Sequence, residues 1–353
     1  MGIKFGNIEL EKHGKPCFIA DIAANHDGDL QRAFKLIELA KEAGADIAKF
    51  QNFHANRIVS RNGFDTMEKQ THQSAWKKSV YEVYEDASLN EEWNAKLKEK
   101  CDEIGIEYMT SPYDFESIDQ VDPLLNAYKI GSGDITWTEI LEYMAKKGKP
   151  MLLATGASTL EDVDRAMHAI SEHNNQIVLM QCNTNYTAHV DNFQYINLNV
   201  LKTYEQRYPS AILGLSDHTQ GHATVLGAIA LGAVVIEKHF TDDNDREGPD
   251  HKFSMTPATW REMVTQSNYL WNSLGDGIKR VEENEQQTVV VQRRALYTTR
   301  PLEAGAVLQE SDVFPLRPCK VGGILPCEVA EFIGKKINKN IGQDTCLTRE
   351  DFV

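Results

Sequence analysis

Residues 211–240 read AILGLSDHTQGHATVLGAIALGAVVIEKHF and contain two short apolar runs, AILGLSDH (211–218) and VVIEKHF (234–240). Each run begins with mostly apolar residues and ends in a polar or aromatic cluster that includes a histidine. Such runs are typical of strands that are covered on both faces, as in parallel sheets. The residues between them leave room for a helix, so the stretch predicts a strand, a helix and a second strand.

Six further runs of the same kind precede this stretch: CFIADIAAN (17–25), DIAKFQN (46–52), IEYMTSPY (106–113), AYKIGSG (127–133), MLLATG (151–156) and IVLMQCN (177–183). Helical patterns lie between several of them, including one at 158–170, where we expect a capping box from Ser158 to Glu161. Eight strands, each followed by a helix or by room for one, predict a closed (β/α)8 barrel of the TIM type. A doubly wound open sheet is the alternative, because periodicity alone does not distinguish the two.

The composition excludes several classes of protein. The chain has 353 residues, and 52 acidic against 37 basic side chains give a formal net charge of −15. This charge repels phosphate and argues against a general nucleic-acid binder. We find neither an apolar stretch long enough to span a membrane nor the apolar core of a signal peptide. Six cysteines without CxxC spacing indicate reduced thiols, so we expect a cytoplasmic protein with no nucleic-acid or membrane partner.

The character of the sequence changes along the chain. We expect a barrel domain at 1–275, a polar, charged linker at 276–292 and a small domain at 293–353, in which short strands are followed by a helix at 327–337. One connection in the barrel, 53–90, is unusually long. A long insertion after a barrel strand lies at the catalytic face, so we interpret it as a substrate lid.

Polar residues gather at the ends of the predicted strands. In a barrel, the carboxyl ends of the strands surround one shared site. One such residue alone would mean little, but their coincidence over seven strands predicts an enzyme active site. The residues are Asp21, Asn25, His26, Lys49, Gln51, Lys129, Ser132, Asp134, Thr155, Asn183, Tyr186, Ser216, Asp217, His218, Glu237, Lys238 and His239.

Two histidines, His218 and His239, end the seventh and eighth strands. Neighbouring strands lie about 4.8 Å apart, so two imidazoles at matching height can share one metal ion. Two ligands leave positions open for water and a substrate oxygen, which suits Lewis-acid catalysis. The alternative is a pair of hydrogen-bonded core histidines.

Two lysines, Lys49 and Lys129, follow apolar runs and are expected to project inward. An unpaired buried ammonium group is unfavourable, so an anionic ligand between the two would account for them. Ser132 and Ser216 could add hydrogen-bond donors to a phosphate or carboxylate. The alternative is that each lysine pairs with a local carboxylate such as Asp134 or Glu237.

The same motifs resemble a known family. The runs IADIAANHDGD, GADIAKFQ, TSPYDFES, YKIGSGD, GLSDHTQG, IEKHFT and REGPDHKFSM, in this order, resemble the sialic acid (N-acetylneuraminate) synthases, which make nonulosonic acids from phosphoenolpyruvate and an N-acylated hexosamine. The tail RRALYTTRPLEAGAVLQESDVFPLRP resembles the antifreeze-like (SAF) domain, a small β-clip fold that closes this family. The resemblance covers nearly the whole chain.

The resemblance implies a metal-dependent barrel in a domain-exchanged homodimer. His218 and His239 would hold Mn²⁺, although imidazole ligands also suit Mg²⁺ or Co²⁺. The residues matching the phosphoenolpyruvate site are Lys49, Lys129, Ser132, Asn183 and Ser216. The residues matching the sugar contacts are Gln51, Asp134, Tyr186 and Asp250. Arg317 matches an arginine that the small domain inserts into the partner's site.

Several positions depart from the sialic acid pattern. Asp21 and Asp134 stand where glutamates are usual, Ala154 stands where a phosphate-binding serine is common, and QCNTNYT (181–187) replaces HCTxxYP. A shorter carboxylate leaves room for a larger sugar or a water molecule. These changes keep the reaction type but leave the sugar open among N-acetylmannosamine, a diacetamido-trideoxyhexose and a phosphorylated sugar.

The expected reaction joins phosphoenolpyruvate to a sugar aldehyde, adds water and releases inorganic phosphate. Asp21 or Asp134 could move the protons, and the sequence does not choose between them. One alternative is an aldolase that forms a Schiff base on Lys129 or Lys49. Another is a non-catalytic carbohydrate-binding protein.

Overall fold

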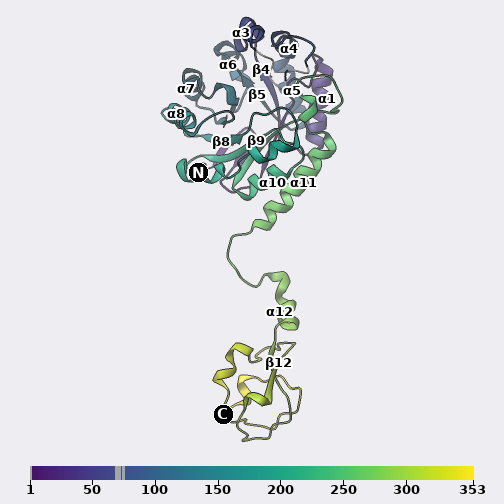
Figure 1. The fold of residues 1–353 in the computed structure, drawn as a ribbon, viewed down its shortest axis with the longest axis vertical. Coiled ribbons are helices and arrows are strands. Elements are labelled where there is room, and N and C mark those ends of the chain that lie inside the picture. Colours follow the sequence, from purple (N-terminus) through teal and green to yellow (C-terminus); the bar gives the residue numbers. More distant parts are fainter. Residues whose placement is uncertain (1, 68–72, 74–75) are drawn as a thin grey trace. The chain divides into compact units, whose positions relative to one another are not determined.

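The computed structural model describes residues 2–67, 73 and 76–353. Eight parallel strands form one sheet in the order β5-β4-β3-β10-β9-β8-β7-β6, part of which is labelled in Figure 1. Its end strands β5 and β6 also lie in contact with each other. The predicted TIM-type barrel is therefore confirmed, and the open doubly wound alternative is wrong. The strands are β3 (Cys17–Asp21), β4 (Ile47–Asn52), β5 (Glu107–Pro112), β6 (Tyr128–Ile130), β7 (Met151–Ala154), β8 (Ile177–Cys182), β9 (Ile212–Asp217) and β10 (Ala233–His239).

Side chains alternate between two apolar cores along each strand, because successive residues of a strand point to opposite faces. On β3, Cys17 and Ile19 belong to a core inside the barrel, whereas Phe18 and Ala20 belong to the larger core between strands and helices. The same alternation decides which polar residues reach the interior at the carboxyl ends of the strands.

A hairpin that the sequence did not indicate joins the inner core. It consists of β1 (Ile3–Phe5) and β2 (Ile8–Leu10), which pair antiparallel. Ile3, Phe5 and Leu10 are buried in the same apolar cluster as the inward residues of the barrel strands. Since that cluster includes the first residue of β3, the hairpin covers the amino-terminal end of the barrel and leaves the opposite end for polar residues.

Helices surround the strands, as Figure 1 shows for α10 and α11. The capping box predicted from Ser158 to Glu161 is wrong by one residue. It joins Thr159 to Asp162, because the Thr159 side chain accepts from the Asp162 amide at the first turn of α8. The helices between and after the strands are α1 (Leu30–Glu42), α5 (Trp93–Ile104), α6 (Phe115–Val121), α7 (Thr138–Lys146), α8 (Leu160–Ser171), α9 (Val200–Arg207), α10 (Ala223–Ala230) and α11 (Pro257–Leu274).

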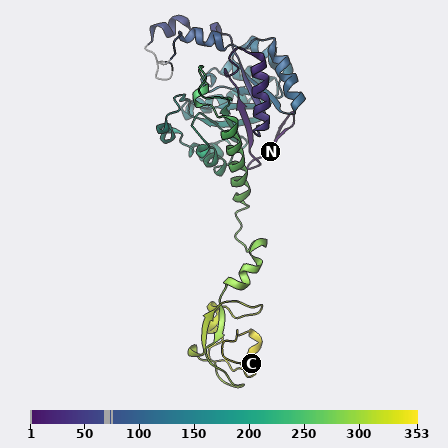
Figure 2. The ribbon, with the colours of Figure 1, turned by 90° about the vertical axis from the view of Figure 1, so that its right-hand side faces the viewer.

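The insertion after β4 contains α2 (Ala55–Ile58), α3 (Arg61–Thr66) and α4 (Val80–Ala87), which lie at one end of the barrel unit in Figure 2. The ring of Phe53, where the insertion begins, contacts Tyr84 of α4 at 5.5 Å and Tyr113 after β5 at 5.9 Å between centroids. These contacts attach the insertion to the barrel. Residues 68–72 and 74–75, which also belong to the predicted lid, lie outside the described residues.

The chain divides into two compact units, Met1–Gly275 and Asp276–Val353. The second unit begins with the segment expected to be a linker, which contains α12 (Gln286–Gln292). Its antiparallel strands β11 (Ala295–Thr298) and β12 (Val313–Leu316) adjoin a separate apolar core. The helix expected at 327–337 is wrong, because only a 3-10 helix at Pro326–Glu331 forms there before Gly334 takes a positive φ of 88°.

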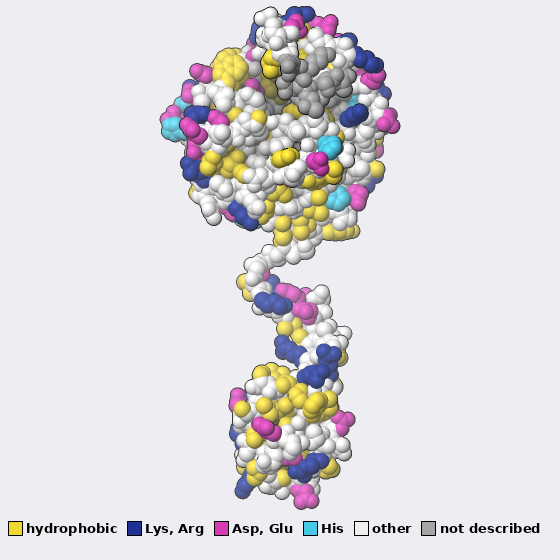
Figure 3. Space-filling view, viewed as in Figure 1, with side chains coloured by type: hydrophobic (Ala, Val, Ile, Leu, Met, Phe, Trp, Pro, Cys, Tyr) yellow, Lys and Arg dark blue, Asp and Glu magenta, His cyan; other side chains and the backbone are white. Residues whose placement is uncertain are grey.

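The surface agrees with the composition. Around the barrel unit in Figure 3, acidic and basic side chains are interspersed and do not form one basic patch on this face. Within the described part of the chain, no helix is long and apolar enough to cross a membrane.

Candidate active site

Four charged side chains meet inside the barrel. The Lys49 Nζ atom lies 2.7 Å from Asp21 Oδ2 and 3.9 Å from Glu237 Oε1. Lys129 reaches the same Glu237 oxygen at 3.3 Å from the other side of the barrel. All four residues are at most 4% exposed. The chain itself thus pairs both ammonium groups, as one alternative expected, and their burial alone does not require a bound anion.

Electrostatics keep the Lys49 amine protonated. Burial acts to lower its pKa, but the neighbouring carboxylates of Asp21 and Glu237 raise the pKa above its ordinary value. One oxygen of Glu237, Oε2, is buried without a hydrogen-bond partner among the described residues. A ligand or water donor could satisfy it.

The two predicted histidines are neighbours at the carboxyl ends of β9 and β10. The ring centroids of His218 and His239 are 5.4 Å apart. The His218 Nδ1 atom lies 2.9 Å from the carbonyl oxygen of Asn183. His239 Nδ1 is buried with no hydrogen-bond partner in the described chain, and its ring lies 3.6 Å from Asp21 Oδ2 and 3.9 Å from Asp250 Oδ2. This is not the pattern of two satisfied core histidines.

These histidines fit a divalent cation. A ring that donates Nδ1–H to a carbonyl oxygen, as His218 can, presents Nε2 as a ligand. Burial and the nearby His218 and Lys49 hold the pKa of His239 well below its ordinary value, which keeps that imidazole neutral. Burial acts to lower the pKa of His218 as well, but contacts with Cys182 raise it above its ordinary value. Since a metal ligand must be neutral, a cation would have to displace a proton from His218. Within the described residues, no group of three or more His, Cys, Asp or Glu side chains is placed to hold a metal ion. A two-histidine metal site therefore stays a prediction.

The serines and Asn183 lie on the β6-to-β9 side of the barrel mouth. The amide of Gly156 donates to Ser132 Oγ at 2.9 Å, and Ser216 Oγ donates to Glu237 Oε1 at 3.3 Å. A Cβ atom added to Gly156 would lie 2.9 Å from Ser132 Oγ and 3.1 Å from Cys182 Sγ. This close approach leaves room only for glycine, whose amide bonds to Ser132.

The expected sugar contacts lie around the same opening. Gln51 donates to Asp21 Oδ2 at 3.1 Å, and the Tyr186 ring lies 4.5 Å from that of His218. Burial raises the pKa of Asp134 to about 6, although Lys129 opposes the shift. Burial and the charge of Asp21 raise the pKa of Asp250 to about 6 as well.

Arg317 belongs to the second unit, directly after β12. Its side chain is exposed and forms no ion pair with any described residue. Its role toward a partner's site remains a prediction.

Three polar residues predicted to reach the interior do not. Lys238 and Asp217 point toward the helices and pair at 2.5 Å, with Thr224 at the start of α10 donating to the same carboxylate. Thr155 donates to the carbonyl of Met180 and accepts from Tyr204 of α9. Strand alternation is the reason, because Lys238 lies between the inward residues Glu237 and His239.

Sequence reasoning missed three further residues near the site. Tyr84 and Tyr113 have a raised pKa, caused first by burial and then by carboxylates that include Asp134. Burial alone would raise the pKa of Cys182, but contacts with His218 and Ser132 lower it. Cys182 could have been found from alternation on β8, whereas the position of Tyr84 depends on how the insertion packs.

A (β/α)8 barrel with charged and imidazole groups at the carboxyl ends of its strands has the architecture of a TIM-barrel enzyme. A model of the NeuB family matches residues 36–279, and a SAF domain model matches residues 293–353. The chain belongs to the NeuB family.

Individual relatives extend over nearly the whole chain. It is 34% identical to N,N'-diacetyllegionaminic acid synthase of Legionella pneumophila, over 98% of each chain. It is 33% identical to the enzyme of the same name from Campylobacter jejuni, over 94% of this chain and 99% of the relative. The structure of the putative spore coat polysaccharide biosynthesis protein E from Chromobacterium violaceum matches with a TM-score of 0.74 and 26% identity, covering 96% of this chain and all of that one.

Proposed function

We propose that this protein condenses phosphoenolpyruvate with the open-chain aldehyde of an N-acylated amino sugar to give a nonulosonic acid and inorganic phosphate. The observation that supports this most is the full-length similarity to two enzymes named N,N'-diacetyllegionaminic acid synthase. The same names favour a diacetamido-trideoxyhexose as the sugar. The aspartates at 21 and 134, each one methylene shorter than glutamate, agree with a bulkier substrate.

The reaction balances as follows. C3 of phosphoenolpyruvate forms a bond to the aldehyde carbon, whose oxygen gains a proton, and positive charge develops at C2. Water adds to C2, and the C2–O bond to phosphate then breaks. The side chains of Asp21 and Glu237 would stabilise the charge at C2, and Asp134, with a pKa of about 6, could carry a proton. A divalent cation on His218 and His239 would supply Lewis-acid polarisation of the aldehyde.

Lys49 and Lys129 would bind the phosphate and carboxylate of phosphoenolpyruvate while Asp21 and Glu237 fix their positions. Ser132, Ser216 and the amide of Asn183 would add hydrogen bonds. A Schiff-base mechanism needs a neutral amine, and the raised pKa of Lys49 opposes this. No observation favours the aldolase or the non-catalytic binding protein over the synthase.

A panel of sugars tests the proposal directly. The protein is incubated with phosphoenolpyruvate, Mn²⁺ and, in turn, N-acetylmannosamine, its 6-phosphate, and diacetamido-trideoxyhexoses of different configuration. We expect phosphate release and a product mass equal to sugar plus pyruvate, with the highest kcat/KM for a diacetamido sugar. Absence of phosphate release with every sugar would reject the synthase, and an adduct trapped by borohydride would favour the aldolase.

Removing the positive charge of Lys49 or Lys129 should weaken phosphoenolpyruvate binding. We expect Lys49→Met and Lys129→Met each to raise the KM for phosphoenolpyruvate about 10- to 100-fold, the effect of one charge-assisted contact, and to change the KM for the sugar much less. Lys147→Met is the matched control, because Lys147 pairs with Asp119 on the outer helices at 2.6 Å. Initial rates at varied concentrations of each substrate give both KM values. An unchanged KM for phosphoenolpyruvate in both variants would reject its binding by the two lysines.

Asp134 should affect both the stability of the fold, through its ionisation, and the rate of the reaction. Because burial raises its pKa to about 6 in the folded protein, the folded state binds the proton more tightly than the unfolded chain. Ionisation of Asp134 therefore destabilises the fold above pH 6, and the penalty disappears as the pH falls below the ordinary carboxyl pKa of about 3.9. We expect Asp134→Asn to raise the Tm at pH 8 but not at pH 3.5, and to lower kcat.

Thermal unfolding across this pH range, with steady-state kinetics at pH 8, checks both parts. An equal gain in Tm at pH 8 and pH 3.5 would show that ionisation of Asp134 is not the cause. An unchanged kcat would remove Asp134 from the reaction.

A further inference from the structure

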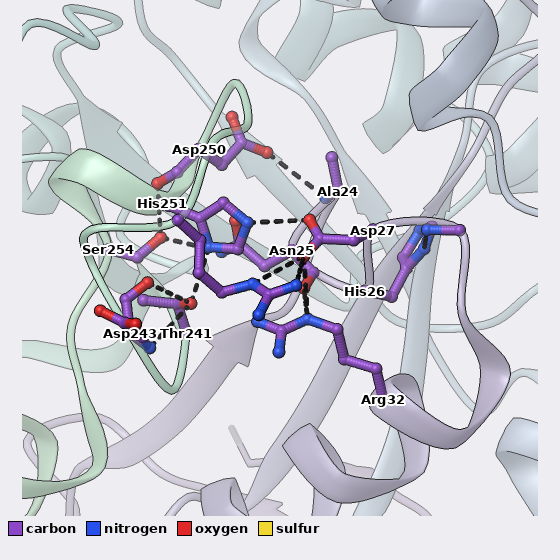
Figure 4. Close-up of polar contacts among 12 residues, drawn as sticks. Ala24, Asn25, His26, Asp27, Arg32, Thr241, Asp243, Asp250, His251 and Ser254 are labelled. Carbon is purple, nitrogen blue, oxygen red and sulfur yellow. Dashed lines mark hydrogen bonds and ion pairs between the residues drawn. The ribbon is translucent and has the colours of Figure 1, made fainter.

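Two loops at the mouth of the barrel are joined by one carboxylate. Asp27 lies between β3 and α1, and its side chain accepts from His251 Nε2 at 2.9 Å and from Arg246 Nε at 2.8 Å. Arg32 Nε, which donates to the Asn25 carbonyl, forms an ion pair with Asp27 at 3.1 Å (Figure 4). Arg246 and His251 belong to the loop after β10. The contact between Asp27 and His251 spans 224 positions of the sequence. It ties the first strand of the barrel to the loop that follows the last.

The His251 ring is held on every side. The residue is fully buried, and its second ring nitrogen, Nδ1, lies 2.8 Å from Thr241 Oγ1. A Cβ atom added to Gly248 would lie 2.6 Å from His251 Cδ2, so only glycine permits this packing. With both nitrogens bonded and the ring enclosed, His251 has a single orientation.

The neighbouring residue, Asp250, points to the candidate active site. Its Oδ2 atom accepts from the Ala24 amide at 3.3 Å and lies 3.9 Å from His239 Nδ1. Its carbonyl oxygen accepts from Ser254 Oγ at 2.7 Å, and Asn25 donates to that hydroxyl at 2.9 Å (Figure 4). Asp250 is therefore placed by both loops.

Within the described chain, Asp27 and His251 form no hydrogen bond or ion pair with Lys49, Lys129 or the two histidines of the candidate site. Although burial acts to raise the pKa of Asp27, hydrogen bonds from His251 and Arg246 lower it, so this carboxylate stays charged. A charged group enclosed by donors is suited to holding a loop and not to exchanging protons with a substrate.

We propose that Asp27 and His251 form a positioning pair, which holds the loop after β10 so that the Asp250 carboxylate faces His239 in the reacting site. This inference rests on the proposed function for its kinetic consequence. The pair acts through Asp250 and does not touch substrate.

Hydrogen exchange tests the positioning pair without any substrate. We expect Asp27→Asn and His251→Ala to speed amide exchange about 10-fold or more in residues 22–29 and 241–256, and to leave the barrel strands unchanged. His251→Gln should restore most of the protection, because its side-chain amide can still donate to Asp27. Asp164→Asn is the matched control, since Asp164 accepts two bonds from Arg207, both at 2.6 Å, on the outer helices. Unchanged exchange in both loops would overturn the proposal.

A double-mutant cycle tests the connection to catalysis. We expect His251→Ala to lower kcat about 10- to 100-fold while the KM for phosphoenolpyruvate changes less than about twofold. In an Asp250→Ala background, the same substitution should cause less than about a twofold further loss, because residues that act through one group are not additive. If the double variant loses kcat by the product of the two separate factors, the proposal that His251 acts through Asp250 is overturned.

The outcomes separate the two proposals. If the wild-type protein releases no phosphate with any sugar, the synthase function fails. Hydrogen exchange still decides whether Asp27 and His251 hold the two loops together. If His251→Ala does not fold, Asp27→Asn and His251→Gln provide the same comparison. Faster loop exchange together with additive kinetics would leave a structural loop contact and reject the positioning role.

Discussion

Replacing His239 with alanine should abolish phosphate release from phosphoenolpyruvate while the fold survives. The His239 ring is 7% exposed, its Nδ1 has no hydrogen-bond partner in the described chain, and Asp21 and Asp250 face it from two sides. Removing it takes away a ligand for the expected cation and leaves two carboxylates without the imidazole between them. We expect kcat to fall about 10³-fold or more, which corresponds to several kcal/mol of lost transition-state stabilisation.

Metal binding and activity should fail together in this variant. Titration with Mn²⁺ followed by calorimetry measures binding without substrate, and circular dichroism checks the fold. His218→Ala should behave in the same way, whereas His168→Ala, on the exposed face of α8, should match the wild type. Full activity of either variant in chelator-treated buffer would remove the metal assignment.

Complementation between two inactive variants should restore activity, because we expect the small domain to complete the site of a partner subunit. Arg317 is exposed and forms no ion pair in the described chain, as expected of a guanidinium that binds an anion elsewhere. The segment at 276–292 is polar and exposed, which suits a crossing between subunits. The second unit has its own apolar core, so it can keep its fold wherever it docks.

The test mixes Arg317→Ala with a His218→Ala, His239→Ala double variant after subunit exchange. If the small domain crosses over, each heterodimer has one fully wild-type site, and random exchange should restore about a quarter of wild-type activity. If each small domain serves its own barrel, every site retains a defect and the mixture stays inactive. Mass spectrometry of intact dimers verifies the exchange, and an inactive mixture of verified heterodimers would reject the crossover but not the synthase.

The sequence by itself determined the strands and the direction of several side chains. Runs of buried residues, each followed by polar ones, located all eight barrel strands, because parallel strands covered on both faces must be almost wholly apolar. The resemblance of the motifs to sialic acid synthases anticipated the NeuB family. The sequence did not show that Lys238 and Asp217 point away from the barrel interior. A list of strand-end residues takes no account of side-chain alternation until the register of each strand is known.

Closure of the barrel decided which residues from distant parts of the sequence contact one another. Lys129 on β6 meets Glu237 on β10 across the interior, and Asp27 meets His251 across 224 positions of sequence. Sequence patterns report local preferences, whereas such pairs depend on where distant strands and loops are brought by packing. The sequence could therefore name the charged and imidazole groups of the site, but only the tertiary structure decided that the lysines share a carboxylate and that Asp250 is held by both loops.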